Sequence, residues 1–305
     1  MDFFLYIVVR AVVLFIQILP LRVVAGFGRA LGGLFYWIDA RHRRVAMKNL
    51  TACFGEEKTP EEIRAITHEN FRRLGENYLC AVKTAAMTIE QLRPYVEFFG
   101  DYEILREPDN KIFAIGHFGN FELYARFNEI APTHQCATTY RALNQPSLNR
   151  IMLSLREKSG CLFFERRTDA AALKIAMQRP GLLLGLLSDQ HAVGGLRLPF
   201  FGRECSTTTS PAVFALRYHC QLYTAICYRV GPGRWKVEGG AQIPTHVNGV
   251  ARSTAEIMLD VNRALEVAVR RDPANWFWVH NRWKQPKPVP VREPKISGEH
   301  NEATV

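Results

Sequence analysis

The stretch KIFAIGHFGNFELYAR, residues 111–126, combines three local patterns that decide the fold class. Residues 111–115 form an apolar segment of strand type, and a helical pattern begins at Asn120. Between them His117 lies in a segment bounded by Gly116 and Gly119, and glycine permits backbone angles that other residues avoid. The stretch therefore predicts a strand, a turn that carries His117, and a helix.

The same alternation continues along the rest of the chain. We predict further strands at 135–140, 181–187, 221–229 and 234–238, a short apolar segment near Cys161, and helices at 59–87, 146–158, 169–178, 211–218 and 253–273. Strands that alternate with helices are typical of an α/β sheet with helices on its faces. In such sheets functional groups gather at the carboxyl ends of strands.

Composition indicates a globular protein with an anionic partner. Of the 305 residues 48% are hydrophobic, and 39 Lys and Arg against 29 Asp and Glu give a net charge of +10. Such a charge suits a phospholipid surface, a nucleic acid, or an acidic protein or substrate, and does not choose among them. The seven cysteines are scattered, with no Cys-x-x-Cys pair and no zinc-ligand spacing, so we expect free thiols and no metal site.

The N-terminal segment is apolar from residue 3 to residue 37, with only three arginines as charges. Its first part ends before Pro20 and is just long enough to cross a bilayer, but Arg10 near its middle favours a tilted or interfacial helix at least as strongly. We expect residues 1–50 to be retained as a membrane-anchoring segment, although a buried helical hairpin is the alternative. The basic cluster at 39–50 predicts that the remainder faces the cytoplasm. Residues 51–284 are expected to form the α/β domain, and the Pro-rich residues 285–305 a disordered tail.

His117 and Glu122 are a candidate catalytic pair. Inside one regular helix, a spacing of five residues would separate them by about 140°. With His117 in the turn, Glu122 falls in the first helical turn and can fold back toward the imidazole. A carboxylate on one ring nitrogen fixes the tautomer and leaves the other nitrogen to take a proton from a hydroxyl. The alternative is structural: a glutamate there complements the helix dipole, and a turn histidine can pack.

Several motifs carry a family resemblance. GHFGNFE (116–122) resembles the H-x4-D/E motif of glycerolipid acyltransferases in the form found in bacterial lipid A biosynthesis (lauroyl/myristoyl) acyltransferases. Four further segments resemble that family in order, at 140–157, 181–195, 198–217 and 275–284. The family implies a mixed α/β sheet flanked by helices, similar to glycerol-3-phosphate acyltransferase, with N-terminal apolar membrane-anchoring helices, at the bacterial inner membrane and facing the cytoplasm.

The resemblance also implies the reaction and its residues. An acyl chain moves from acyl carrier protein, or from coenzyme A, to a hydroxyl of a glycolipid, foremost a lipid A precursor. The resemblance implies contact with membrane lipids, and no cofactor, metal or nucleic acid. His117 matches the general base and Glu122 its partner carboxylate. Arg156 and Asp189 match functional residues, whereas His191 replaces a second acid of the family motif.

The remaining candidates bind substrate or stabilise charge. Donors to a developing oxyanion are Arg156 or the backbone N–H groups near Asn120, Asp189 can orient Arg156 or an acceptor group, and Arg141 can contact anionic groups. A phosphoinositide mannoside or a lysophospholipid is an alternative acceptor. A lipid hydrolase with a remote serine or cysteine nucleophile and a non-catalytic lipid-binding protein are alternative functions.

Overall fold

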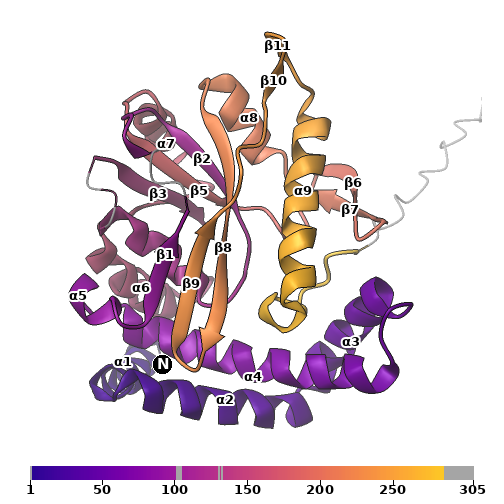
Figure 1. Cartoon of the computed structure of the whole chain (residues 1–305). Coiled ribbons are helices and arrows are strands. Elements are labelled where there is room, and N and C mark those ends of the chain that lie inside the picture. The colour runs from indigo at the N-terminus through magenta and orange to yellow at the C-terminus, as the bar shows by residue number, and fades with distance from the viewer. Residues whose placement is uncertain (1, 101–104, 130, 132, 285–305) are drawn as a thin grey trace, which may run out of the picture.

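A seven-stranded mixed sheet forms the centre of the protein, in a computed structural model that describes residues 2–100, 105–129, 131 and 133–284 (Figure 1). The strand order is β1-β9-β8-β2-β5-β3-β4, and all neighbouring pairs are parallel except β8 and β9. The strands are β1 (Val96–Phe99), β2 (Lys111–Ile115), β3 (Gln135–Tyr140), β4 (Leu162–Glu165), β5 (Leu182–Leu187), β8 (Gln221–Gly231) and β9 (Arg234–Gly239).

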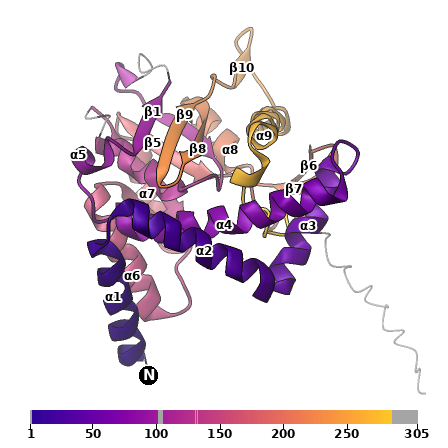
Figure 2. The ribbon, with the colours of Figure 1, turned by 60° about the horizontal axis from the view of Figure 1, so that its bottom comes forward.

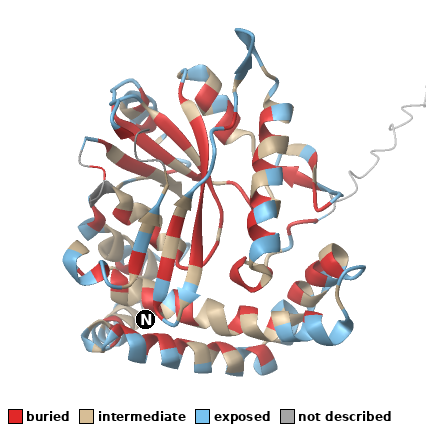
Figure 3. Cartoon of the chain, in the orientation of Figure 1, coloured by how far each residue is buried: buried red, intermediate tan, exposed pale blue. Residues whose placement is uncertain are grey.

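The two faces of the sheet have different surroundings. On one face Ile112 and Ala114 of β2 are fully buried in the main hydrophobic core, to which α8 (Ser210–Arg217) and α9 (Thr254–Arg271) contribute. Helix α9 begins with a capping box between Ser253 and Glu256 and buries one apolar side (Figure 3). The opposite face carries Phe113 and Ile115 and opens into a cavity.

The other elements extend the sheet and its edges. They are α5 (Ile89–Leu92), η2 (Phe121–Glu129), α6 (Pro146–Arg156), η3 (Glu157–Ser159), α7 (Ala170–Met177), the hairpin of β6 (Leu196–Phe200) and β7 (Arg203–Thr207), the hairpin of β10 (His246–Val247) and β11 (Val250–Ala251), and η4 (Pro273–Asn275). Strands β2 and β3 have the bounds predicted from the sequence. The helix predicted from Asn120 is a 3-10 helix, and β1 and both hairpins were not predicted.

Four N-terminal helices lie across one end of the sheet: α1 (Asp2–Ile18), α2 (Leu21–Ile38), α3 (Ala40–Phe54) and α4 (Pro60–Thr84). Figures 1 and 2 show α2 running alongside α4. The two helices approach closely because glycines meet at the contact, where a Cβ on Gly32 would lie 2.1 Å from the carbonyl oxygen of Phe71. Arg29 of α2 also pairs with Glu69 and Glu76 of α4 at 2.9 and 3.1 Å.

The expected membrane-anchoring part of the fold is wrong. In the described part of the chain, no helix combines the length and the apolar character needed to cross a membrane. The apolar run is divided, because α1 ends at Ile18 before Pro20 and α2 carries Arg22 and Arg29. The predicted tail at 285–305 lies outside the described residues, and the predicted domain boundary at residue 50 stays a prediction.

Candidate active site

His117 and Asp189 meet at the carboxyl ends of two adjacent strands. In the parallel pairing of β2 and β5, Ile115 lies opposite Leu187. His117 and Asp189 each follow their member of this pair by two residues. The imidazole Nδ1 of His117 lies 2.7 Å from Oδ1 of Asp189, and the backbone N–H of His117 donates to Oδ2 at 2.7 Å. The strand register therefore sets this contact, although the two residues are 72 positions apart in sequence.

Asp189 is held as a buried carboxylate. Its side chain is fully buried, and Oδ2 accepts a second hydrogen bond from the indole Nε1 of Trp276 at 2.8 Å. Burial alone raises the pKa of Asp189, but the neighbouring His117 and these hydrogen bonds outweigh it and lower the pKa to about 2. Asp189 is therefore ionised near neutral pH and holds Nδ1 of His117, which leaves Nε2 for the cavity.

The turn that carries His117 requires both of its glycines. Gly119 has φ +51°, and a Cβ there would lie 2.5 Å from the carbonyl oxygen of Cys227. A Cβ on Gly116 would lie 2.6 Å from the ring of Phe118 and 3.1 Å from Oδ2 of Asp189. Side chains at these positions would displace the backbone that aims the imidazole.

Trp276 is positioned by a C-terminal segment that buried amide side chains hold in place. Asn70 of α4 donates to the carbonyl oxygens of Ala274 and Trp276 at 2.9 and 2.6 Å. Asn49 of α3 donates to the carbonyl oxygens of Trp278 and His280, both at 2.9 Å. The N-terminal helices thus fix the segment that supplies a hydrogen bond to Asp189.

Glu122 bonds to Arg156 and not to His117, which corrects the contact expected from the sequence. Nε of Arg156 donates to Oε2 of Glu122 at 3.0 Å and Nη2 donates to Oε1 at 2.6 Å, a two-pronged ion pair. His117 does lie in the turn and Glu122 does lie in the first turn of η2. The sequence reasoning gave the right local conformation but the wrong partner, because the ends of α6 and β5 come from distant parts of the chain.

The other candidates lie at different depths. Asn120 is buried, and its Nδ2 donates to the hydroxyl of Thr84 at 3.3 Å. Arg156 leaves Nη1 buried without a hydrogen-bond partner among the described residues, and its guanidinium lies 5.0 Å from the ring centre of Phe163. Arg141 is exposed and lines the cavity. The structure brings Glu122 and Arg156 into contact and leaves Arg141 apart from that pair.

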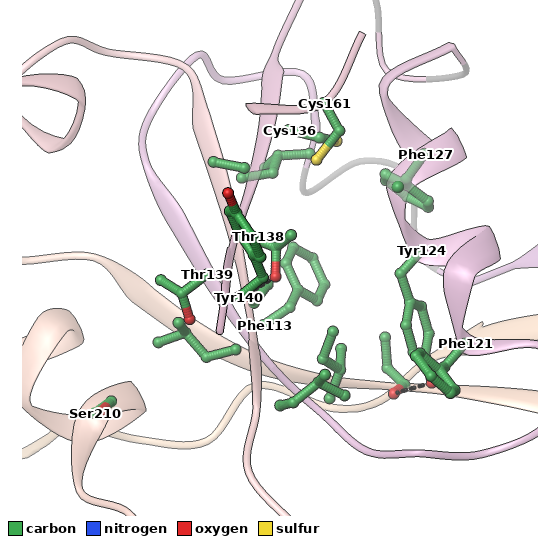
Figure 4. Close-up of a pocket in the computed structure, with 18 of the residues that line it drawn as sticks. Phe113, Phe121, Tyr124, Phe127, Cys136, Thr138, Thr139, Tyr140, Cys161 and Ser210 are labelled. Carbon is green, nitrogen blue, oxygen red and sulfur yellow. Dashed lines mark hydrogen bonds between the residues drawn. The ribbon is translucent and has the colours of Figure 1, made fainter. Parts of the chain in front are cut away.

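A cavity of about 1170 Å³ adjoins His117, and Figure 4 shows part of its lining. Its walls include the open face of the sheet, with Phe113, Ile115 and Tyr223 among many apolar side chains, and both members of the Glu122–Arg156 pair. Figure 4 places Cys136 and Cys161 on one side of this space and Phe121 and Tyr124 on another. An elongated apolar group fits such a wall better than a polar one.

The sequence analysis missed two further groups beside this site. Trp276 was not among the residues predicted for the site, yet its indole N–H donates a hydrogen bond to Asp189. His280 lines the cavity and accepts a hydrogen bond at Nε2 from the backbone N–H of His191 at 3.0 Å. Burial above all lowers the pKa of His280, to about 4, so it is neutral near pH 7. Their place in the segment 275–284, which resembles the family, was the only sequence signal for either residue.

Comparison with known proteins decides the family. A family model described as bacterial lipid A biosynthesis acyltransferase matches residues 2–285, nearly the whole chain. The chain belongs to this family. The protein is therefore an acyltransferase, and the resemblance inferred from the motifs is confirmed.

Two curated relatives agree with the assignment of this acyltransferase. The lipid A biosynthesis palmitoleoyltransferase of Escherichia coli (strain K12) is 23% identical over 274 residues, covering 87% of this chain and 86% of the relative. The lipid A biosynthesis acyltransferase of Shigella flexneri matches with the same identity and coverage. The similarity thus extends along most of the length of the acyltransferase.

Proposed function

We propose that this acyltransferase moves a fatty acyl chain from a thioester donor to a hydroxyl of a lipid A precursor, with His117 as the general base. The observation that carries the proposal is the His117–Asp189 pair beside the large apolar cavity. A buried carboxylate on Nδ1 fixes the tautomer in which Nε2 accepts a proton, and it stabilises the imidazolium that results. The acceptor hydroxyl loses its proton to Nε2 as its oxygen attacks the thioester carbonyl.

Collapse of the tetrahedral intermediate then releases the donor thiolate, which takes up the proton from His117. The negative charge that develops on the carbonyl oxygen needs donors, and we assign this role to Arg156. Its Nη1 is buried without a partner among the described residues, and the pair with Glu122 fixes the plane of the guanidinium. Glu122 is then a positioning residue that acts through Arg156.

The donor is proposed to be acyl carrier protein, with coenzyme A as the alternative. The family resemblance implies acyl carrier protein as the donor. Acyl carrier protein is acidic, and the net charge of +10 favours such a partner. Lipid A precursors carry phosphate groups, so the positive net charge favours their binding as well. The location facing the cytoplasm at the inner membrane stays a prediction.

A lipid hydrolase with a protein nucleophile is the competing reaction. The cysteines nearest the cavity do not suit it, because burial raises the pKa of Cys136 and raises that of Cys161 to about 12. Among the described residues, no serine, threonine or cysteine side chain bonds to the imidazole of His117. The nucleophile is therefore assigned to the substrate.

The experiment is acyl transfer by the purified full chain. Acyl carrier protein and coenzyme A thioesters are offered with a lipid A precursor, and mass spectrometry follows the gain of one acyl group. The wild type is expected to acylate the precursor, and His117→Ala is expected to lose transfer while it melts at the wild-type temperature. Full activity in His117→Ala, or a covalent acyl-protein trapped with labelled donor, would overturn the proposal.

A further inference from the structure

A second, smaller pocket of about 250 Å³ adjoins the same reactive residues. It lies between one face of α4, one face of α6 and the start of η2. The α4 residues recur at helical spacing, as do those of α6. The residues that line it from these two helices are Leu74, Asn77, Tyr78, Ala81, Val82 and Thr84 on α4 and Met152, Leu155 and Arg156 on α6.

The two cavities share a wall at the reaction centre. His117, Phe121, Glu122 and Arg156 line both of them. A substrate group in the small pocket and a second substrate group in the large cavity can therefore meet at Nε2 of His117. A transfer between two lipid substrates requires this arrangement, because the thioester carbonyl and the attacking hydroxyl must approach the same base.

The small pocket has a mixed lining of apolar side chains and buried polar ones. Ala81 and Leu155 face the space from opposite helices, with Val82 and Phe277 beside them. Asn120, in the same lining, is 1% exposed, and its Oδ1 has no hydrogen-bond partner in the described part of the chain. A ligand that satisfies this oxygen carries a hydrogen-bond donor, such as a hydroxyl, next to an apolar chain.

We propose that the small pocket binds a hydrocarbon chain of the acceptor lipid, with its polar end at Asn120. This inference rests on the proposed function and names where the second substrate is held. The large cavity offers both an apolar end near Phe113 and an exposed rim at Arg141, which suits the acyl chain and polar arm of the donor. With the donor in the large cavity, the small pocket, which meets that cavity at His117, is left for the acceptor chain.

Two variants fill the small pocket from opposite sides. Ala81→Phe acts from α4 and Leu155→Trp acts from α6. Ala65→Phe is the matched control, because Ala65 is exposed on α4 and lines neither cavity. Thermal melting of all three variants shows whether the fold is kept, and either filled variant alone suffices for the test.

The readout is the dependence of acceptor KM on the length of the acceptor chain. In the wild type and in Ala65→Phe, each added methylene is expected to lower this KM by up to about fourfold. In the filled variants the KM for the acceptor is expected to rise at least about tenfold and to lose its dependence on chain length, while the KM for the donor stays constant. A retained dependence would overturn the proposal, as would a change in donor chain preference, which would place the donor chain in this pocket.

A binding experiment separates failure of this inference from failure of the proposed function. The His117→Ala chain is saturated with an unreactive thioether analogue of the acyl donor and titrated with alkyl glycosides of increasing chain length. Binding that tightens with chain length, and that stops doing so once Ala81→Phe is added, supports the pocket even if no lipid A precursor is acylated. Equal binding by the His117→Ala protein and by the same protein with Ala81→Phe added rejects the pocket, whatever reaction the protein catalyses.

Discussion

Two carboxylates lie within the same site and have opposite surroundings. Asp189 is fully buried and accepts three hydrogen bonds, two from His117 and one from Trp276. The side chain of Glu122 is 29% exposed and pairs only with Arg156 among the described residues. Burial makes each hydrogen bond to Asp189 costly to lose, whereas solvent screens the Glu122 pair. The comparison teaches that the carboxylate nearest in sequence to a histidine need not be the one that binds its ring.

Asp189→Asn is the substitution with the largest expected effect. An amide cannot stabilise an imidazolium and favours the wrong tautomer of His117, and removal of an orienting carboxylate in this way costs roughly 10⁴-fold in kcat. Steady-state transfer rates at saturating donor and acceptor measure the loss. If Asp189→Asn retained more than a tenth of the activity and Glu122→Gln did not, the roles given to the two carboxylates would be reversed.

Glu122→Gln is expected to lower kcat by about 10- to 100-fold. The amide keeps one hydrogen bond to Arg156 but removes the charge that fixes the guanidinium, so the donor to the developing oxyanion is less well oriented. A role in positioning predicts that kcat falls while the KM for the acceptor stays constant. A rise in the acceptor KM with an unchanged kcat would instead indicate that Glu122 binds the acceptor.

Trp276→Phe is expected to reduce activity by about tenfold and stability by about 1–2 kcal/mol. The ring packing is largely kept, but Asp189 loses one of its three donors in a dry site. Chemical denaturation gives the stability, and transfer assays give the rate. Trp283→Phe is the comparison, since its indole N–H donates to the carbonyl oxygen of Phe200 at 3.1 Å, away from Asp189, and the rate should then be unchanged.

How far the sequence predicts this molecule depends on the range of the interactions involved. The strand at 111–115 and the turn at His117 follow from an apolar run and two glycines, all within ten residues. The His117–Asp189 contact depends on the adjacency of β2 and β5, which no local pattern encodes. The membrane-anchoring role of residues 1–50 was predicted from hydropathy, which does not register that Arg29 pairs with Glu69 and Glu76. Short hairpins such as β6–β7 lack the periodicity that marks longer elements.

The buried carboxylate also makes the stability of the fold sensitive to acid, without a direct effect on the rate near neutral pH. The folded-state pKa of Asp189 is about 2, below the ordinary value of 3.8. The unfolded chain therefore binds the proton more readily, so the stabilisation from Asp189 is fully present above about pH 4 and is lost as the pH falls toward 2. It amounts to about 2 kcal/mol. Denaturant titrations between pH 2 and pH 5 should show a shallower loss of stability for Asp189→Asn than for the wild type, because the amide has no proton to gain. If the wild type and Asp189→Asn lost stability equally between pH 5 and pH 2, other carboxyl groups would be responsible for the loss in acid.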